Sequence, residues 1–195
     1  MIRRHHFLRG LAAALALGAA MPAALAQSSK PIRLVVPFPA GGATDLFART
    51  LSQKMGERLG TSIVIDNKPG AGGSLGSDMA AKATADGQTL LFTTTSTHSI
   101  GPAIGAKLPY DTVRDFTPIA HVGNAPSIML VPNSSPANTV KEWIEYAKKN
   151  PGKLNYASSG NGTIVQLTAE LFKAQAGLFV THIPYKGTGL AIPDL

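Results

Sequence analysis

The sequence contains no cysteine and one tryptophan, and charged residues make up only 15% of its 195 positions. Without cysteine the chain can form no disulfide, so its stability must come from a hydrophobic core. Lysine and arginine are scattered, whereas nucleic-acid-binding proteins carry a basic stripe interleaved with aromatic residues. After residue 26 no run of 18 apolar residues occurs, so no membrane-spanning helix is predicted there.

The first 26 residues have the pattern of a signal peptide. Three arginines in the first nine residues precede an apolar stretch at 11–20 and an A-x-A cleavage site at 24–26. We therefore expect export and cleavage near Ala26, by the general secretory or the twin-arginine route. Removing 26 residues from 195 leaves 169, with 15 basic and 11 acidic side chains. This mild positive charge suits an anionic ligand.

Short apolar runs alternate with helical patterns along the rest of the chain. The spacing predicts strands over 32–36, 62–65, 89–93, 154–157 and 178–183, and helices over 45–59, 74–83, 139–149 and 163–176. Residues 96–118 are predicted to form a loop, and 119–122 and 127–131 two extended segments that lead into a second lobe. Alternating strands and helices indicate βαβ units and mainly parallel sheets in an α/β fold.

Two strand-to-helix turns are the most informative feature. The run that ends at Val36 enters a Pro/Gly turn, after which Thr44 or Asp45 is expected to open a helix. Unpaired N–H groups at a helix start bind anions without a cationic side chain. A second turn of this kind follows the strand at 154–157, so two facing turns would hold a small carboxylate. Asp45 is expected to cap the helix or orient water, because a carboxylate repels an anionic ligand.

Other chemistries have less support. The glycines at 70–76 imitate a dinucleotide-binding turn, but no acidic residue follows at a strand end, so close helix–strand packing is expected. His98, His121 and His182 lack metal-ligand spacing, and neither a metal nor a cofactor is expected. The chain also lacks G-x-S-x-G and an evident His–acid pair, which argues against an enzyme.

Five ordered motifs carry a family resemblance: PFPAGGATD at 37–45, NKPGAGGSLG at 67–76, KLPYDTVRDFTPIA at 107–120, KNPGKLNYASSGNGT at 149–163 and IPYKG at 183–187. With these motifs the chain resembles the periplasmic receptors of tripartite tricarboxylate transporters, the Bug family. The resemblance implies a two-lobed periplasmic binding protein of the type II, Venus-flytrap class. Its lobes would span 27–120 and 121–195.

The resemblance also implies a function and partners. The ligand would be a small carboxylate: a tricarboxylate, a dicarboxylate, an amino acid or an aromatic acid. The receptor would be a periplasmic monomer that serves the membrane subunits of a transporter and binds no nucleic acid.

The family's cleft residues carry over to the matching positions of this sequence. The implied ligand-binding residues are Pro39, Ala40, Gly41, Gly42, Thr44, Asp45, Thr94, Ser96, Thr97, Ser158, Ser159, Gly160, Asn161, Gly162, Thr163 and Tyr185. Gln166 and Leu190 stand where many relatives have His and Pro, and these departures are expected to matter little to the site.

The sequence stops at Leu195, in the first turn of an expected helix. A lobe that ends there leaves a sheet edge and an apolar face without cover, so both lobes are expected to be incomplete through C-terminal truncation. The alternative to a working receptor is therefore a remnant that binds nothing. An exported α/β enzyme is the least supported alternative.

Overall fold

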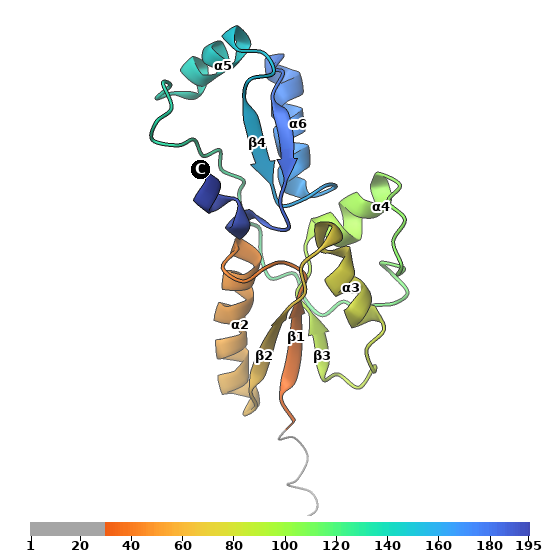
Figure 1. The fold of residues 1–195 in the computed structure, drawn as a ribbon. Helices are drawn as coiled ribbons and strands as arrows, with labels where there is room; N and C mark the ends of the chain where they lie inside the picture. Colours follow the sequence, from red (N-terminus) through yellow and green to blue (C-terminus); the bar gives the residue numbers. More distant parts are fainter. Residues whose placement is uncertain (1–29) are drawn as a thin grey trace, which may run out of the picture.

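The computed structural model describes residues 30–195, so the predicted signal peptide lies outside the described residues. The chain forms two α/β units, one below the other in Figure 1. The first has a parallel sheet of order β2-β1-β3, and the second a parallel pair β4-β5. The strands are β1 (Ile32–Val36), β2 (Ile63–Asn67), β3 (Thr89–Leu91), β4 (Asn155–Ser158) and β5 (Thr181–Pro184). The predicted parallel α/β class is confirmed.

The first unit is built around β1, which is buried on both faces. Helix α2 (Ala43–Leu59) lies on one side of the sheet and α3 (Ser74–Ala81) on the other (Figure 1). Leu34 and Val36 pack with Ala48 of α2, while Val35 between them is also fully buried. A central parallel strand covered on both sides requires this continuous apolar run.

The second unit has its own small core. Helices α5 (Val140–Lys149) and α6 (Ile164–Ala176) supply Ala147 and Phe172, which pack with Leu178 and Val180. Trp143 lies against the same cluster, 6.0 Å from the Phe172 ring centroid. No helix among residues 30–195 is both long and apolar enough to cross a membrane.

Several helix ends lie where the sequence predicts them. Thr139 and Glu142 form a complete capping box at α5, and Gly60 and Gly177 end α2 and α6 in the left-handed conformation. The start of α2 differs from the prediction. Its N-cap is Gly42, and the helix begins at Ala43 instead of at Thr44 or Asp45.

The predicted loop at 96–118 is partly helical. It contains the π-helical turn η3 (Ser96–Ile100) and the short helix α4 (Gly101–Ala103). Pro102 lies in the first turn of α4, where a missing N–H costs nothing.

The extended segments at 119–122 and 127–131 are not part of a sheet in the described chain. Their side chains are exposed, with Ile119 at 78% and Ile128 at 82%. Strand 178–183 is also shorter than predicted, because β5 extends only where β4 pairs with it, from Thr181 onward.

Gly76 tests the packing of α3 on β1. A Cβ atom there would lie 2.7 Å from the carbonyl oxygen of Lys68 and 2.8 Å from Cα of Pro37, which bears out the close packing predicted for 70–76. We expect Gly76→Ala to lower the free energy of unfolding by about 1–3 kcal/mol, although alanine favours helix formation. Urea denaturation measures this change.

The matched control is Met79→Ala in the same helix, where the side chain is exposed. It should change the stability by less than about 0.5 kcal/mol. A Gly76→Ala variant as stable as this control would contradict the close contact.

Candidate ligand-binding site

The carboxyl ends of both parallel sheets point toward the junction of the two units (Figure 1). The chain leaves β1 at Val36 to form the turn 37–42 before α2, and it leaves β4 at Ser158 to form the turn 159–163 before α6. Ligands of open α/β sheets bind at these ends. The fold therefore brings both predicted turns to one interface.

Asp45 organises the first turn. Its carboxylate is buried and accepts hydrogen bonds from the Gly41 N–H at 2.9 Å and from Arg49 Nε at 2.8 Å, both on Oδ2. Oδ1 accepts from Asn67 Nδ2 at 2.9 Å, and the same Asn67 nitrogen donates to the carbonyl of Phe38. One carboxylate thus connects the turn, the helix and the end of β2.

These contacts also set the ionisation of Asp45. Burial alone would raise the pKa of the carboxyl, but the hydrogen bonds from Arg49, Gly41 and Asn67 and the charge of Arg49 lower that pKa below its ordinary value of 3.8. The charge of Asp45 is therefore largely compensated within the protein.

The N-terminus of α2 has no side-chain cap. The first N–H groups of a helix lack intrahelical partners. The backbone N–H groups from Gly42 to Thr44 therefore remain available to an acceptor. A loop of the second unit lies directly opposite. A Cβ atom on Gly42 would lie 3.7 Å from the Thr188 hydroxyl oxygen and 3.9 Å from the Gly189 nitrogen.

The second turn is mostly hydrogen-bonded within its own unit. Ser158 Oγ accepts from the Gly160 N–H at 3.0 Å, and the Thr163 hydroxyl donates to the Gly160 carbonyl at 2.7 Å. Gln166 Oε1 accepts from the Gly162 N–H at 2.7 Å, so Gln166 matters to the turn more than the sequence indicated. Ser159, next to Ser158 in the turn, is also buried.

Contacts between the units join each turn to a different loop. The Ile164 N–H, at the start of α6, donates to Ser96 Oγ at 3.1 Å. A Cβ atom on Gly72 would lie 2.7 Å from the carbonyl oxygen of Asn161. The second turn therefore faces residues of 71–73 and 96, while the first faces 187–189.

A cavity of about 330 Å³ lies beside the second turn. Of the predicted residues it is lined by Ser96, Thr97, Asn161 and Gly162, and it does not include the first turn. Further lining residues come from the 70–76 loop and from 101–108: Ala71, Gly72, Ser74, Gly101, Ile104, Ala106, Lys107 and Leu108. Sequence reasoning missed Lys107 as a site residue, although it opens one of the family motifs.

Two further predicted residues have distinct environments. Thr94 Oγ1 is a buried atom without a hydrogen-bond partner in the described chain. Tyr185 donates its hydroxyl to Asp194 at 2.5 Å, which raises the pKa of the phenol and engages its proton. The Tyr185 hydroxyl is therefore not a free donor in this structure. Pro39 and Ala40 belong to the first turn, where a Cβ atom on Gly187 would overlap the Pro39 ring.

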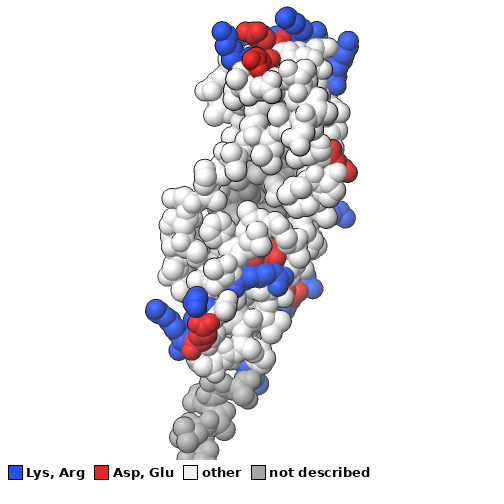
Figure 2. Space-filling view, turned by 90° about the vertical axis from the view of Figure 1, so that its left-hand side faces the viewer, with Lys and Arg blue, Asp and Glu red and all other residues white. Residues whose placement is uncertain are grey.

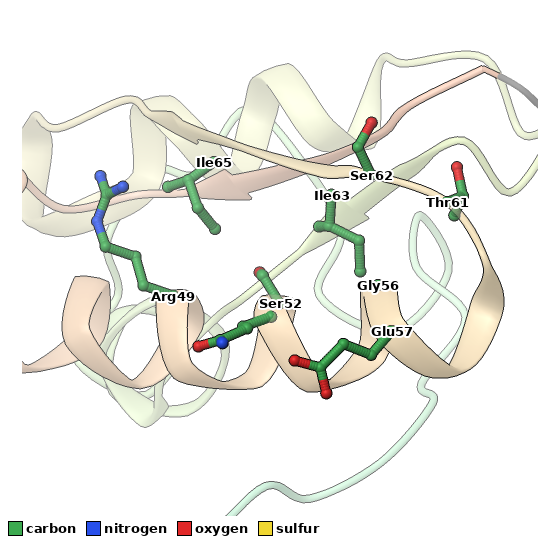
Figure 3. Close-up of a pocket in the computed structure, with 9 residues that line it drawn as sticks. Arg49, Ser52, Gly56, Glu57, Thr61, Ser62, Ile63 and Ile65 are labelled. Carbon is green, nitrogen blue, oxygen red and sulfur yellow. The ribbon is translucent and has the colours of Figure 1, made fainter.

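A second pocket, of about 400 Å³, lies away from both turns. Figure 3 shows Arg49 and Ser52 of α2 opposite Ile63 and Ile65 of β2, which is the edge strand of the sheet. The lining of this pocket contains neither the turn residues nor a helix N-terminus.

Charge is unevenly distributed over the face shown in Figure 2. Lysine, arginine and acidic side chains gather toward the two ends of the molecule, and the band between them carries few charges. Among residues 30–195 no three His, Asp or Glu side chains are grouped to hold a metal ion.

The chain matches the family described as tripartite tricarboxylate transporter family receptor over residues 47–195. It is 40% identical to the UPF0065 protein in the tcbD–tcbE intergenic region of Pseudomonas sp. (strain P51), over 100% of this chain and 58% of that relative. It is 36% identical to the protein BugT of Bordetella pertussis, over 86% of this chain and 52% of BugT. The chain thus spans little more than half the length of these relatives.

Solved structures give the same result. An R. palustris protein with adipate superposes with a TM-score of 0.83 at 36% identity, covering 87% of this chain and 56% of that chain. MatC from Rhodopseudomonas palustris with bound malate superposes with a TM-score of 0.78 at 34% identity, covering 85% of this chain and 56% of that chain. The periplasmic binding protein BugD superposes with a TM-score of 0.73 at 33% identity, covering 86% of this chain and 56% of that chain.

The fold is therefore that of the periplasmic binding proteins, a class of solute-binding receptors and not of enzymes. Within that class, the chain belongs to the receptor family of the tripartite tricarboxylate transporters.

Replacing Asp45 tests the first turn. We expect Asp45→Asn to lower the free energy of unfolding by about 1–3 kcal/mol at neutral pH, because an amide cannot accept all three hydrogen bonds and leaves Arg49 uncompensated. Since the folded-state pKa lies below 3.8, the carboxylate contributes fully above that value and loses its contribution as the pH falls through the folded-state pKa.

The difference between wild type and Asp45→Asn should be the same at about pH 7 and about pH 5, and should shrink only under more acidic conditions. Glu57→Gln serves as the control, since Glu57 makes only an exposed ion pair with Lys54. Equal stability of Asp45→Asn and wild type at neutral pH would be inconsistent with the network.

Proposed function

We propose that this chain carries the ligand-binding cleft of a periplasmic receptor for a small carboxylate. The observation on which the proposal depends is the uncapped N-terminus of α2, placed against Thr188 at the junction of the units. A carboxylate there would accept hydrogen bonds from the helix amides and interact favourably with the helix dipole. Charge-assisted hydrogen bonds in a desolvated cleft are stronger than hydrogen bonds between neutral groups.

The described contacts sort the predicted residues into two groups. The backbone amides at the uncapped start of α2 would contact a ligand directly, and the hydroxyls of Thr44 and Ser159 would add to these contacts. Ser158 and Thr163 are engaged within the second turn and would shape it. Asp45 is compensated by Arg49, so its charge opposes the ligand less than its position suggests.

The relatives indicate the ligand class. One solved neighbour carries adipate and another malate, and both ligands are small dicarboxylates. We infer a di- or tricarboxylate, an amino acid or an aromatic acid as ligand for this chain. Thr94 Oγ1 and Lys107 offer further polar contacts near the interface.

Location and partners follow from the family. We propose that residues 1–26 direct export to the periplasm and are removed near Ala26. The lobes would divide near residue 120, in the extended segment that joins the two units. Closure of the lobes around the ligand would form the surface recognised by the membrane subunits of a tripartite transporter.

The competing proposal is a chain that does not bind alone. Its support is that the chain covers little more than half of its relatives and exposes the apolar segment 127–131. The experiment below separates the two proposals.

We expect malate, adipate or another small carboxylate to raise the melting temperature of the chain. Only a ligand that binds the folded state raises the melting temperature. At a ligand concentration of 100 times Kd, this binding adds about 2.7 kcal/mol to the free energy of unfolding. Gly42→Val should abolish this shift, because its methyl groups would occupy the space between the turn and Thr188. Gly42 has φ −80° and its Cβ would contact nothing closer than 3.6 Å, so the variant should still fold.

Gly123→Val is the matched control, since a Cβ atom at Gly123 would meet no atom within 4 Å. It should keep the ligand-induced shift. A cooperative melt that no carboxylate raises would favour the chain that does not bind alone. A shift that persists in Gly42→Val would exclude the first turn as the site.

A further inference from the structure

Three side chains connect strand β5 to the second turn. His182 Nε2 lies 2.6 Å from Ser158 Oγ, and His182 Nδ1 lies 3.3 Å from Gln166 Nε2. Gln166 Oε1 in turn accepts from the Gly162 N–H at 2.7 Å. These hydrogen bonds therefore run from Ser158, at the end of β4, through His182 and Gln166 to Gly162 in the second turn.

The backbone fixes the direction of each hydrogen bond in this chain. A backbone N–H can only donate, so the Gln166 atom that faces Gly162 must be the oxygen. The Gln166 NH₂ group then faces His182 Nδ1, and because NH₂ only donates, Nδ1 must be unprotonated. A neutral imidazole with a bare Nδ1 carries its proton on Nε2, which therefore donates to Ser158 Oγ.

Ser158 Oγ now accepts two hydrogen bonds, from His182 and from the Gly160 N–H. Ser158 Oγ donates its own proton to the carbonyl oxygen of Gly160, 3.2 Å away. All hydrogen-bonding capacity of this hydroxyl is therefore used to hold the turn.

We propose that His182, held as the Nε2–H tautomer by Gln166, is a positioning residue that fixes the second turn for ligand binding. This inference rests on the proposed carboxylate receptor. It also separates the Ser158–His182 pair from a nucleophile and its base, because an Nε2 that already carries a proton cannot accept one from Ser158.

Protonation of His182 would break the arrangement. The second proton would enter at Nδ1 and point at the Gln166 NH₂, so that two donors face each other. The groups around the ring come from β4 and α6: Tyr156 stacks on it at 4.8 Å between centroids, and Glu170 and Lys173 lie beyond Tyr156. Burial lowers the pKa of His182, Glu170 opposes this and Lys173 adds to it, so the neutral ring prevails at neutral pH.

Gln166→Glu is the sharpest test. The two side chains have the same shape, and a carboxylate oxygen can still accept from the Gly162 N–H, but the other oxygen now accepts from His182 instead of donating. We expect ¹⁵N spectra of ring-labelled histidine in the full chain to show Nε2–H for His182 in the wild type. Gln166→Glu should protonate Nδ1 and raise the His182 pKa by about 1–3 units.

The signal is assigned by its loss in His182→Asn. Gln53→Glu, on the exposed surface of α2, adds the same charge far from the turn and should leave His182 unchanged. An Nδ1–H tautomer in the wild type, or an unaltered His182 in Gln166→Glu, would overturn the assignment without any reference to ligand.

The second readout uses the carboxylate, malate or adipate, that shifts the wild-type melt. In Gln166→Glu the neutral Nδ1–H ring has a bare Nε2, so Ser158 donates to it and loses its hydrogen bond to the Gly160 carbonyl. We expect this variant to bind the carboxylate about tenfold more weakly at neutral pH, the effect of that one lost hydrogen bond, and Gln53→Glu to bind normally. Wild-type affinity should fall as the pH drops through the His182 pKa. Unchanged affinity in Gln166→Glu, with the tautomer altered, would refute the positioning role. A wild type that binds no carboxylate would refute the proposed function and leave the tautomer to be judged by its spectrum.

Discussion

The structure depends on the buried carboxylate of Asp45 more than on any other single group. It accepts hydrogen bonds from the turn after β1, from helix α2 and from Asn67 at the end of β2. Removing it would leave Arg49 and two polar donors without their acceptor. Helix α2 begins at Ala43 after the N-cap Gly42, and because glycine has no side chain the first amides of the helix have no side-chain cap. Asp45 thus joins the edge strand β2 to the turn at which we propose that an anion binds.

The second turn is prepared differently. Its amides at Gly160 and Gly162 already have side-chain partners, and His182 and Gln166 complete their arrangement. A turn whose donors are already satisfied within its own unit contributes mainly a fixed shape. The two turns therefore differ: the first precedes helix amides without a side-chain cap, and the second is held in shape by its own side chains.

The sequence predicted the parallel sheets and most helix ends because these follow from local rules: the buried run Leu34–Val36, the capping Thr139 and the terminal Gly60. It did not predict the start of α2, since Asp45 forms contacts with Asn67, 22 positions away. Lys107 and Thr188 were missed as site residues for a related reason. Only the packing of the two units brings them to the interface, and no local pattern encodes that packing.

We propose that a carboxylate binds to the backbone amides at the start of α2. Titration of the ¹⁵N-labelled chain with malate and adipate, followed by backbone amide chemical shifts, tests it most directly. Binding at this helix start should produce saturable changes that are largest at 42–44, with smaller ones at 159–163. Saturable changes confined to another surface, such as the pocket beside Ser52 and Ile63, would contradict it, as would the absence of any saturable change.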